Sequence, residues 1–308
     1  MTVSDQIDRE LEASGLRGFV HAIDIKSGDQ VGLREGELVC LASVLKIAVL
    51  VELYRRFDEG SLDPRQRIRV PASRRTFGPT GLSMLKDDVD LSLRDLAFLM
   101  MHVSDNTASD VVQEILTTEA VNANLRRLGL DETVLIGDCK LVLDQQQEDT
   151  GLTVDELIAG RLPDPETLRH FRSLTPGRTT RSTPREMTRL LVAIWTDRAA
   201  SPPACEEMRA IMKAQVWPHR LRSGFGDGIV VGGKTGTLAG IRNEVGAVEY
   251  PDGAHYAVAV FTRSIPAFEV RPAQLPPRVD PAADGLIGKV ARMAVDHLRA
   301  PGAAQAPA

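Results

Sequence analysis

Hydrophobic residues recur with a helical period through the middle of the chain and with a strand period near both ends. The segment 43–57 is apolar on nearly every face, which predicts a buried helix. Apolar residues three and four apart predict further helices at 5–14, 92–101, 107–116, 118–128, 184–195 and 284–298. Alternating apolar residues beside turn residues predict strands at 17–25, 228–232, 244–249 and 256–263, and a short strand that ends at Arg34.

Strands at both ends around a helical middle predict two lobes. The first is an α/β lobe made of residues 1–41 and 197–308, and the second is an all-α lobe made of residues 42–196. The stretch 137–182, rich in Gly, Pro, Arg and Thr, contains one short candidate helix near 154–159. We interpret it as an atypical long loop, of the kind that often carries function.

Composition narrows the possible partners. The 308 residues include 37 basic and 42 acidic side chains, for a net charge of −5, without a Lys/Arg run that could neutralise a row of phosphates. We therefore expect no nucleic-acid partner. Apolar runs stay short of the roughly 18 residues that a membrane span needs, so no membrane association is expected. The segment after Met1 is polar, which predicts a cytoplasmic protein, or a secreted or periplasmic one if a leader has been removed.

Metal and redox chemistry find no support in the spacing of the ligand-type residues. The three cysteines, Cys40, Cys139 and Cys205, are neither paired in number nor spaced as zinc ligands, and the six histidines form no metal-binding pattern. The sequence therefore predicts no metal, no disulfide framework and no cofactor.

Three short strings occur in order along the chain: Ser43-Val-Leu-Lys46, Ser104-Asp105-Asn106 and Lys234-Thr235-Gly236. Each is weak by itself, but from this composition all three in this order arise by chance at roughly 10⁻⁵ to 10⁻⁴. Ser43 and Lys46 lie three apart at a predicted helix start, so the lysine amine can reach the serine hydroxyl. Lys46 can act as a base if burial and a second cation, for which Lys234 is the candidate, lower its pKa.

Together these strings resemble the class A-like branch of the serine β-lactamases and penicillin-recognising serine hydrolases. The resemblance covers nearly the whole chain, including Ser182-Thr183-Pro184 at a predicted helix start and Ile241-Arg242-Asn243-Glu244 after the third string. It implies an α+β fold in which helices flank an antiparallel sheet, with an all-α lobe beside it. The active site is then expected at the seam between the two lobes.

The resemblance also implies roles for individual residues. Ser43 carries the acyl group, Lys46 is its base, and Ser104 passes a proton to the leaving nitrogen. The implied substrate-binding residues are Asn106, Lys234, Thr235, Gly236, Thr237 and Arg242, and the amides of Thr237 and Ser43 form the implied oxyanion hole. An ordinary surface position is an equal alternative for Arg242. The loop 76–84 either contacts a substrate through Phe77 or Leu82 or is plain surface.

The chain departs from this family where deacylation is concerned. Class A β-lactamases activate the deacylating water with a Glu in a Glu-x-x-Leu-Asn loop, and the usual distance from Ser104 falls near Lys140, where no carboxylate stands. Counting back from Thr183-Pro184 reaches Glu166 instead, beyond an insertion. Glu166 is therefore the predicted deacylating base and Glu148 the second choice, although an exposed helix-start Glu explains Glu166 equally well.

The leading prediction is a serine hydrolase that forms an acyl-enzyme on Ser43 and hydrolyses β-lactam amides, with a small molecule as its substrate. The alternatives on the same scaffold are an esterase, a D-alanyl peptidase or an acyltransferase. A third possibility, from another class, is a slow penicillin-binding or sensor module. The natural acyl group and the oligomeric state are left open by the sequence.

Overall fold

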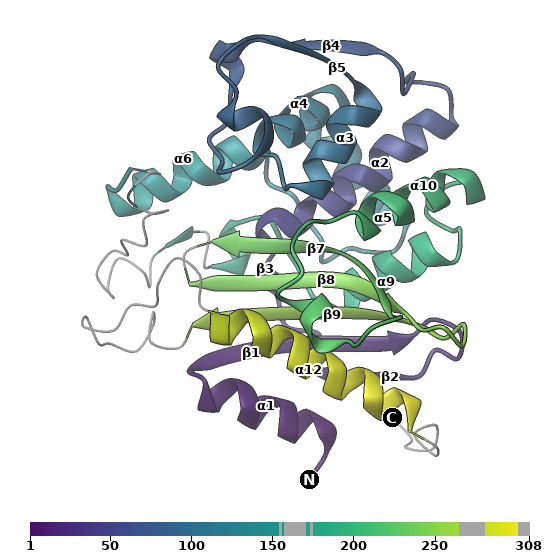
Figure 1. Cartoon of the computed structure of the whole chain (residues 1–308). Helices are drawn as coiled ribbons and strands as arrows, with labels where there is room; N and C mark the ends of the chain where they lie inside the picture. Colours follow the sequence, from purple (N-terminus) through teal and green to yellow (C-terminus); the bar gives the residue numbers. More distant parts are fainter. Residues whose placement is uncertain (154–155, 157–170, 173–174, 239, 265–280, 301–308) are drawn as a thin grey trace.

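One five-stranded antiparallel sheet forms the centre of the computed structural model, which describes residues 1–153, 156, 171–172, 175–238, 240–264 and 281–300 (Figure 1). The strand order is β2-β1-β9-β8-β7. The strands are β1 (Leu16–Asp24), β2 (Gln30–Leu33), β7 (Val230–Leu238), β8 (Ile241–Glu249) and β9 (His255–Ser264). Because β1 pairs with β9 along its whole length, the first strands of the chain lie beside the last, and β7 is an outer strand of the sheet.

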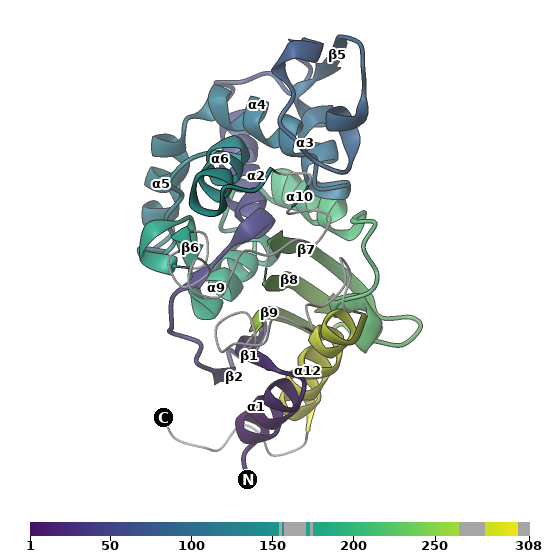
Figure 2. The same cartoon turned by 90° about the vertical axis from the view of Figure 1, so that its left-hand side faces the viewer.

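Helices cover both faces of the sheet, which follows from the alternation of side chains along β1. Val20 and Ala22 belong to one core cluster, together with residues of α1 (Val3–Ala13) and α12 (Pro281–Arg299). These two helices lie beside each other in Figure 2. Phe19 faces the other cluster, to which α9 (Pro184–Trp195) contributes. The predicted antiparallel sheet flanked by helices is confirmed.

The remaining helices pack above the β7 edge in Figure 1, around the buried helix that the sequence predicts. They are α2 (Lys46–Asp58), α3 (Leu93–His102), α4 (Asn106–Leu116), α5 (Thr118–Arg127), α6 (Cys139–Thr150) and α10 (Pro202–Lys213). Short strands connect them: β3 (Val39–Cys40) pairs with β6 (Arg181–Ser182), and β4 (Arg67–Val70) pairs with β5 (Val89–Ser92). Nine residues of α2 are buried, so this helix is the centre of the helical region.

The first difference from the sequence prediction is α6, which forms inside the stretch interpreted as an atypical loop. Asp138 caps it by accepting the Leu141 amide at 2.8 Å, and Gly151 ends it in the left-handed conformation. Its buried positions are Cys139, Val142 and Gln146, at helical spacing. Because one of the three is polar, the apolar stripe that would reveal the helix is missing. The short helix predicted near 154–159 lies almost entirely outside the described residues.

Two further differences concern β7 and α10. β7 continues through Lys234-Thr235-Gly236 to Leu238, whereas the sequence predicts a strand only at 228–232. Glycines lower the strand propensity of this segment, and pairing with β8 forms it instead. α10 is absent from the sequence prediction, although Ser201 caps it and Pro202 opens it.

The cysteines and the ligand-type residues give no sign of metal binding in the part of the chain that is described. All three cysteines are free and buried. No group of three or more His, Cys, Asp and Glu side chains among the described residues could hold a metal ion. Within the same residues, a helix with the length and apolar character of a membrane span is not found.

A buried histidine joins the sheet to α9. The ring of His21 on β1 lies 2.6 Å from the Thr188 hydroxyl and 3.0 Å from the Gln30 side-chain oxygen. Burial lowers the pKa of His21 from 6.5 to about 4, and the charges of Arg185 and Arg189 act in the same direction. The unfolded chain therefore binds a proton more tightly here than the folded chain does.

We expect this histidine to make the fold sensitive to mild acid. The contribution of His21 to the free energy of unfolding is fully present above pH 6.5 and is lost as the pH falls toward about 4, a change of about 3 kcal/mol. His21→Gln should flatten the dependence of the melting temperature on pH between these values. His297→Gln, at an exposed position, is the matched control. An unchanged pH dependence in His21→Gln would contradict this account.

Candidate active site

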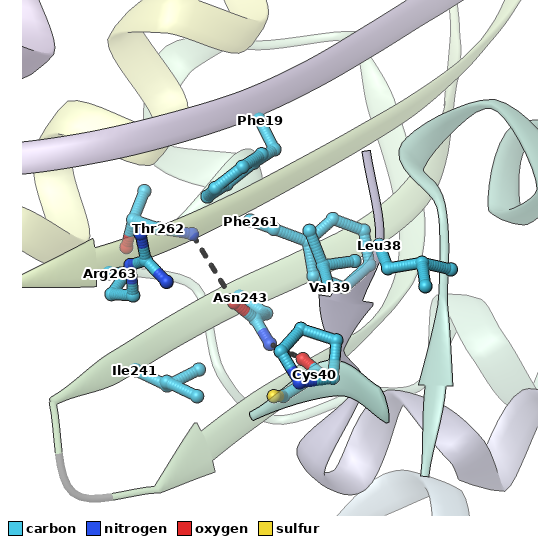
Figure 3. Close-up of a pocket in the computed structure, with 10 residues that line it drawn as sticks. Phe19, Leu38, Val39, Cys40, Ile241, Asn243, Phe261, Thr262 and Arg263 are labelled. Atoms are coloured by element: carbon cyan, nitrogen blue, oxygen red, sulfur yellow. Dashed lines mark hydrogen bonds between the residues drawn. The ribbon is translucent and has the colours of Figure 1, made fainter. Parts of the chain in front are cut away.

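The nucleophile candidate Ser43 lies on a turn that a side chain of β8 anchors through a hydrogen bond. Ser43 is half-buried in a 3-10 helix (Ala42–Leu45) that runs directly into α2, and Ala42 before it adopts a left-handed φ of +50°. Asn243 on β8 donates its side-chain amide to the Cys40 carbonyl at 3.0 Å (Figure 3). The strained residue and the amide anchor together fix where Ser43 emerges at the helix start.

Figure 3 also shows a small pocket behind this turn. Its volume is about 30 Å³, and it shares Cys40 and Asn243 with the anchor. The pocket lies on the sheet side of β3 and has neither Lys46 nor Lys234 in its lining. It is therefore not the candidate active site.

Lys46 connects the first two strings directly. Its side chain is fully buried at the start of α2, and its ammonium donates to the Ser104 carbonyl at 2.8 Å, the Asn106 side-chain oxygen at 2.8 Å and the Ser104 hydroxyl at 3.3 Å. Three acceptors match the three donors of an ammonium group. Ser104 adopts a left-handed φ of +62°, and that conformation lets both its carbonyl and its hydroxyl reach one lysine.

Lys234 brings the third string to the same place. It is fully buried on β7 and donates to the Thr235 carbonyl at 3.0 Å. Burial lowers the pKa of Lys234 well below its usual value, and the neighbouring charge of Lys46 acts in the same direction. Lys46 therefore lies close enough to Lys234 for its charge to act on the Lys234 amine.

Gly236 lets β7 approach the nucleophile turn. A Cβ at this position would lie 2.7 Å from the Leu41 carbonyl oxygen and 3.0 Å from a Val44 methyl group. Since the first of these atoms is backbone, only glycine allows this approach. The third string therefore has a packing role in the fold.

The outer edge of β7 presents backbone amides to the site. The Thr235 amide points away from β8 and donates to the Gln215 side-chain oxygen at 2.7 Å. Amides two residues apart on a strand point the same way, so the Thr237 amide also faces this edge. This orientation agrees with the oxyanion role implied for Thr237.

Gln215 and Glu244, which the sequence analysis does not assign to the site, support β7. The side-chain amide of Gln215 donates to one oxygen of the Glu244 carboxylate at 2.7 Å, and the backbone amide of Leu221 donates to the other oxygen at 2.7 Å. Burial raises the pKa of Glu244, while Leu221, Arg220 and Lys234 oppose this shift. The buried carboxyl group therefore interacts with two cations, Arg220 and Lys234 of β7.

Arg220 is a third residue that the sequence analysis does not assign to the site. Its guanidinium, almost fully buried, donates to the Thr237 hydroxyl at 2.8 Å, the Gly236 carbonyl at 3.0 Å and Asp284 of α12 at 2.6 Å. Arg242, the predicted cation, donates to the Leu238 and Ile241 carbonyls of the β7–β8 turn. A lone arginine in the loop after α10 gives no sequence signal, because only folding brings it to Thr237.

Other residues named from the sequence fall into place around these groups. Asn106 accepts from Lys46 and donates to the Phe77 carbonyl at 2.9 Å, so both ends of its amide are bound within the protein. Phe77 is 39% exposed beside it, whereas Leu82 is buried and cannot line the site. The ring of His102 stacks on the ring of Phe98.

The two predicted deacylating bases are Glu148 and Glu166. Glu148 lies on α6 with 67% of its side chain exposed, and its carboxylate is paired with Arg172 at 2.7 Å. It is therefore engaged at the surface. Glu166 lies outside the described residues. Lys140, which the family's usual spacing from Ser104 reaches, lies in the first turn of α6.

A serine at a helix start beside a buried lysine, a Ser-Asp-Asn turn that binds this lysine, and a second buried lysine on a sheet-edge strand define the penicillin-recognising class of serine proteins. A family model described as the β-lactamase enzyme family matches residues 2–298. The chain belongs to this family.

Individual relatives agree with this assignment. The chain is 30% identical to the β-lactamase regulatory protein BlaB of Streptomyces cacaoi over 97% of its own length and 99% of the relative's. It resembles the crystal structure of a β-lactamase from Sphaerobacter thermophilus with a TM-score of 0.74 and 27% identity, covering 96% of this chain and 95% of that one. It also shares the fold of PBP-A, solved as the acyl-enzyme complex of a point mutant with penicillin G, with a TM-score of 0.75, 20% identity and 96% coverage of both chains.

We expect Gly236→Ala to destabilise the protein through the contact between β7 and the nucleophile turn. The added methyl group must displace the Leu41 carbonyl or β7 itself, at a cost of about 1–3 kcal/mol. Thermal unfolding measures the loss. Gly36→Ala is the control, because a Cβ there meets nothing within 4 Å. Equal melting temperatures for the two variants would show that the close approach is not required.

Proposed function

We propose that the protein is a serine hydrolase that is acylated by β-lactams on Ser43 and hydrolyses their amide bond. The observation that carries this proposal is the Lys46 ammonium, which joins Ser104 and Asn106 beside the helix start that presents Ser43. The family and the fold support the same class of chemistry.

Acylation follows from this arrangement. Lys46, as the free amine, takes the proton of the Ser43 hydroxyl while the serine oxygen attacks the lactam carbonyl. The Thr237 and Ser43 amides stabilise the oxyanion. When the carbon–nitrogen bond breaks, the Ser104 hydroxyl gives its proton to the leaving nitrogen and receives the one held by Lys46. Lys234, which interacts with Lys46, keeps the local field positive during this transfer.

A substrate carboxylate fits the face of β7 that carries Thr235 and Thr237. Arg220 donates to the Thr237 hydroxyl, so a guanidinium already lies at this face, and three other contacts, to Gly236, Asn243 and Asp284, orient it. Charge-assisted hydrogen bonds from such a group contribute about 1.5–3 kcal/mol. We therefore assign to Arg220 the carboxylate-binding role that the sequence analysis gives to Arg242.

Deacylation decides between a hydrolase and a slow penicillin-binding protein. Three buried carboxylates near the strings accept backbone N–H groups and are not free to activate water. They are Asp105, Asp110 and Glu244. Glu166 stays our proposed base. The likeness to a β-lactamase regulatory protein favours the second candidate function, a slowly deacylating penicillin-binding module. An esterase, a D-alanyl peptidase or an acyltransferase on this scaffold needs the same acylation step.

The acylation proposal predicts covalent labelling at one residue. Mass spectrometry of the protein mixed with penicillin G should show an added mass that Ser43→Ala abolishes and that Lys46→Ala delays by about 10²-fold, the scale of losing a general base. Ser27→Ala, on an exposed turn, is the control. Nitrocefin turnover in the same samples separates hydrolysis from a lasting adduct. Labelling of Ser43→Ala at the wild-type rate would remove Ser43 from the mechanism.

The assignment of the carboxylate site predicts a difference between the two arginines. Arg220→Gln should raise KM for a penicillin with a free carboxylate by about 10- to 100-fold, and Arg242→Gln by less than about threefold. The neutral methyl ester of the same penicillin is the internal control, since a general distortion raises KM for both forms. If Arg242→Gln has the larger selective effect, the cation at this site is Arg242.

A further inference from the structure

A single buried carboxylate connects two segments that border the Lys46 site. Asp110 lies on α4, one helical turn after Asn106, which binds Lys46. It accepts the Thr76 hydroxyl at 2.6 Å, the Cys139 amide at 2.8 Å and the Lys140 amide at 3.0 Å. Asp110 thus binds both the segment that leads to Phe77 and the first turn of α6.

The contacts of Asp110 require an acceptor on both oxygens. Each oxygen accepts one backbone N–H group, and one of them accepts the Thr76 hydroxyl as well. A carboxylate satisfies all these donors, whereas an amide presents donors on one side. Burial raises the pKa of Asp110, and the Thr76 hydroxyl and the Cys139 amide counter this shift by stabilising the charged form.

The surroundings of Lys46 give this carboxylate a further effect. Within the described part of the chain, Lys46 interacts electrostatically with titratable groups of three elements: Lys234 of β7, Cys139 of α6 and Asp110 of α4. Burial raises the pKa of the Cys139 thiol to about 12, so this group is neutral. Lys234 repels a charge on Lys46, and Asp110 attracts it. Asp138, at the start of α6, acts on Asp110 as a like charge.

We propose that Asp110 is a positioning residue for the acylation of Ser43: it holds the Thr76 segment and the start of α6 one helical turn from Asn106, which binds Lys46, and its negative charge acts on the Lys46 amine. The proposal rests on the proposed acylation chemistry. A negative charge beside Lys46 favours its ammonium form. Removing the charge therefore favours the free amine, and acylation should begin at a lower pH.

The first test is the second-order rate of acylation by a fluorescent penicillin, measured from about pH 5 to about pH 9. In Asp110→Asn the acidic limb should move down by about one pH unit, because a unit charge has been removed near Lys46. The plateau should fall by about tenfold, because the seat of α6 is lost. Asp138→Asn removes a like charge at the same helix start and still caps α6, so its limb and plateau should stay within about twofold of wild type.

Each result has a fixed meaning. An Asp110→Asn profile that superimposes on wild type, or a lower plateau without a shifted limb, overturns the proposal. If Asp110→Asn does not fold, Thr76→Val replaces it, since this variant removes one hydrogen bond and keeps the charge. It should lower the plateau without moving the limb, and a wild-type plateau overturns the proposal.

A second measurement does not depend on the chemistry. Hydrogen exchange at the Cys139 and Lys140 amides should be about tenfold faster in Asp110→Asn than in wild type or Asp138→Asn, because the acceptor of both amides is weakened. Equal exchange overturns the positioning role. If the wild-type protein takes no penicillin at all, the proposed function fails, and the exchange result still decides the role of Asp110.

Discussion

The burial of the Lys46 ammonium is the constraint on which the rest of the site depends. A charge without water is costly unless acceptors surround it, and three acceptors from the turn after α3 supply that compensation. One of them, the Ser104 carbonyl, is available because its residue takes a left-handed conformation. The Ser-Asp-Asn string therefore has a structural role before it has a chemical one. The same contacts place the Ser104 hydroxyl beside the Lys46 amine, with which it exchanges protons in the proposed mechanism.

The sheet order supplies the second half of the arrangement. Because β1 pairs with β9, β7 is left as an outer strand whose amides face the helical region. Gly236 then allows the nucleophile turn to approach, and Asn243 holds that turn from behind. Cation and hydroxyl groups from distant parts of the chain thus meet at one edge. Local sequence alone could not bring them together.

This division explains what could be predicted. Ser43, Lys46, Ser104 and Lys234 lie in short strings whose chemistry is visible in the residues themselves, and the alternation near both ends predicts the sheet. Arg220 and the support of β7 by its neighbours are tertiary, since single polar residues in a loop have no local pattern. The hydrophobic pattern does not predict α6, because a buried polar residue, Gln146, interrupts the apolar face of this helix.

The buried carboxylates bear on how the site treats acylation and deacylation in the proposed mechanism. Glu244 lies on β8 and Asp110 on α4, and each is held by protein amides. A carboxylate held in this way offsets a neighbouring positive charge while its oxygens remain unavailable to a water molecule. In the proposed mechanism, such a site favours formation of an ester on Ser43, because the lysines and amides act on the first step. Release of the acyl group then needs a base that these held carboxylates do not provide, so acylation and deacylation are under separate structural control.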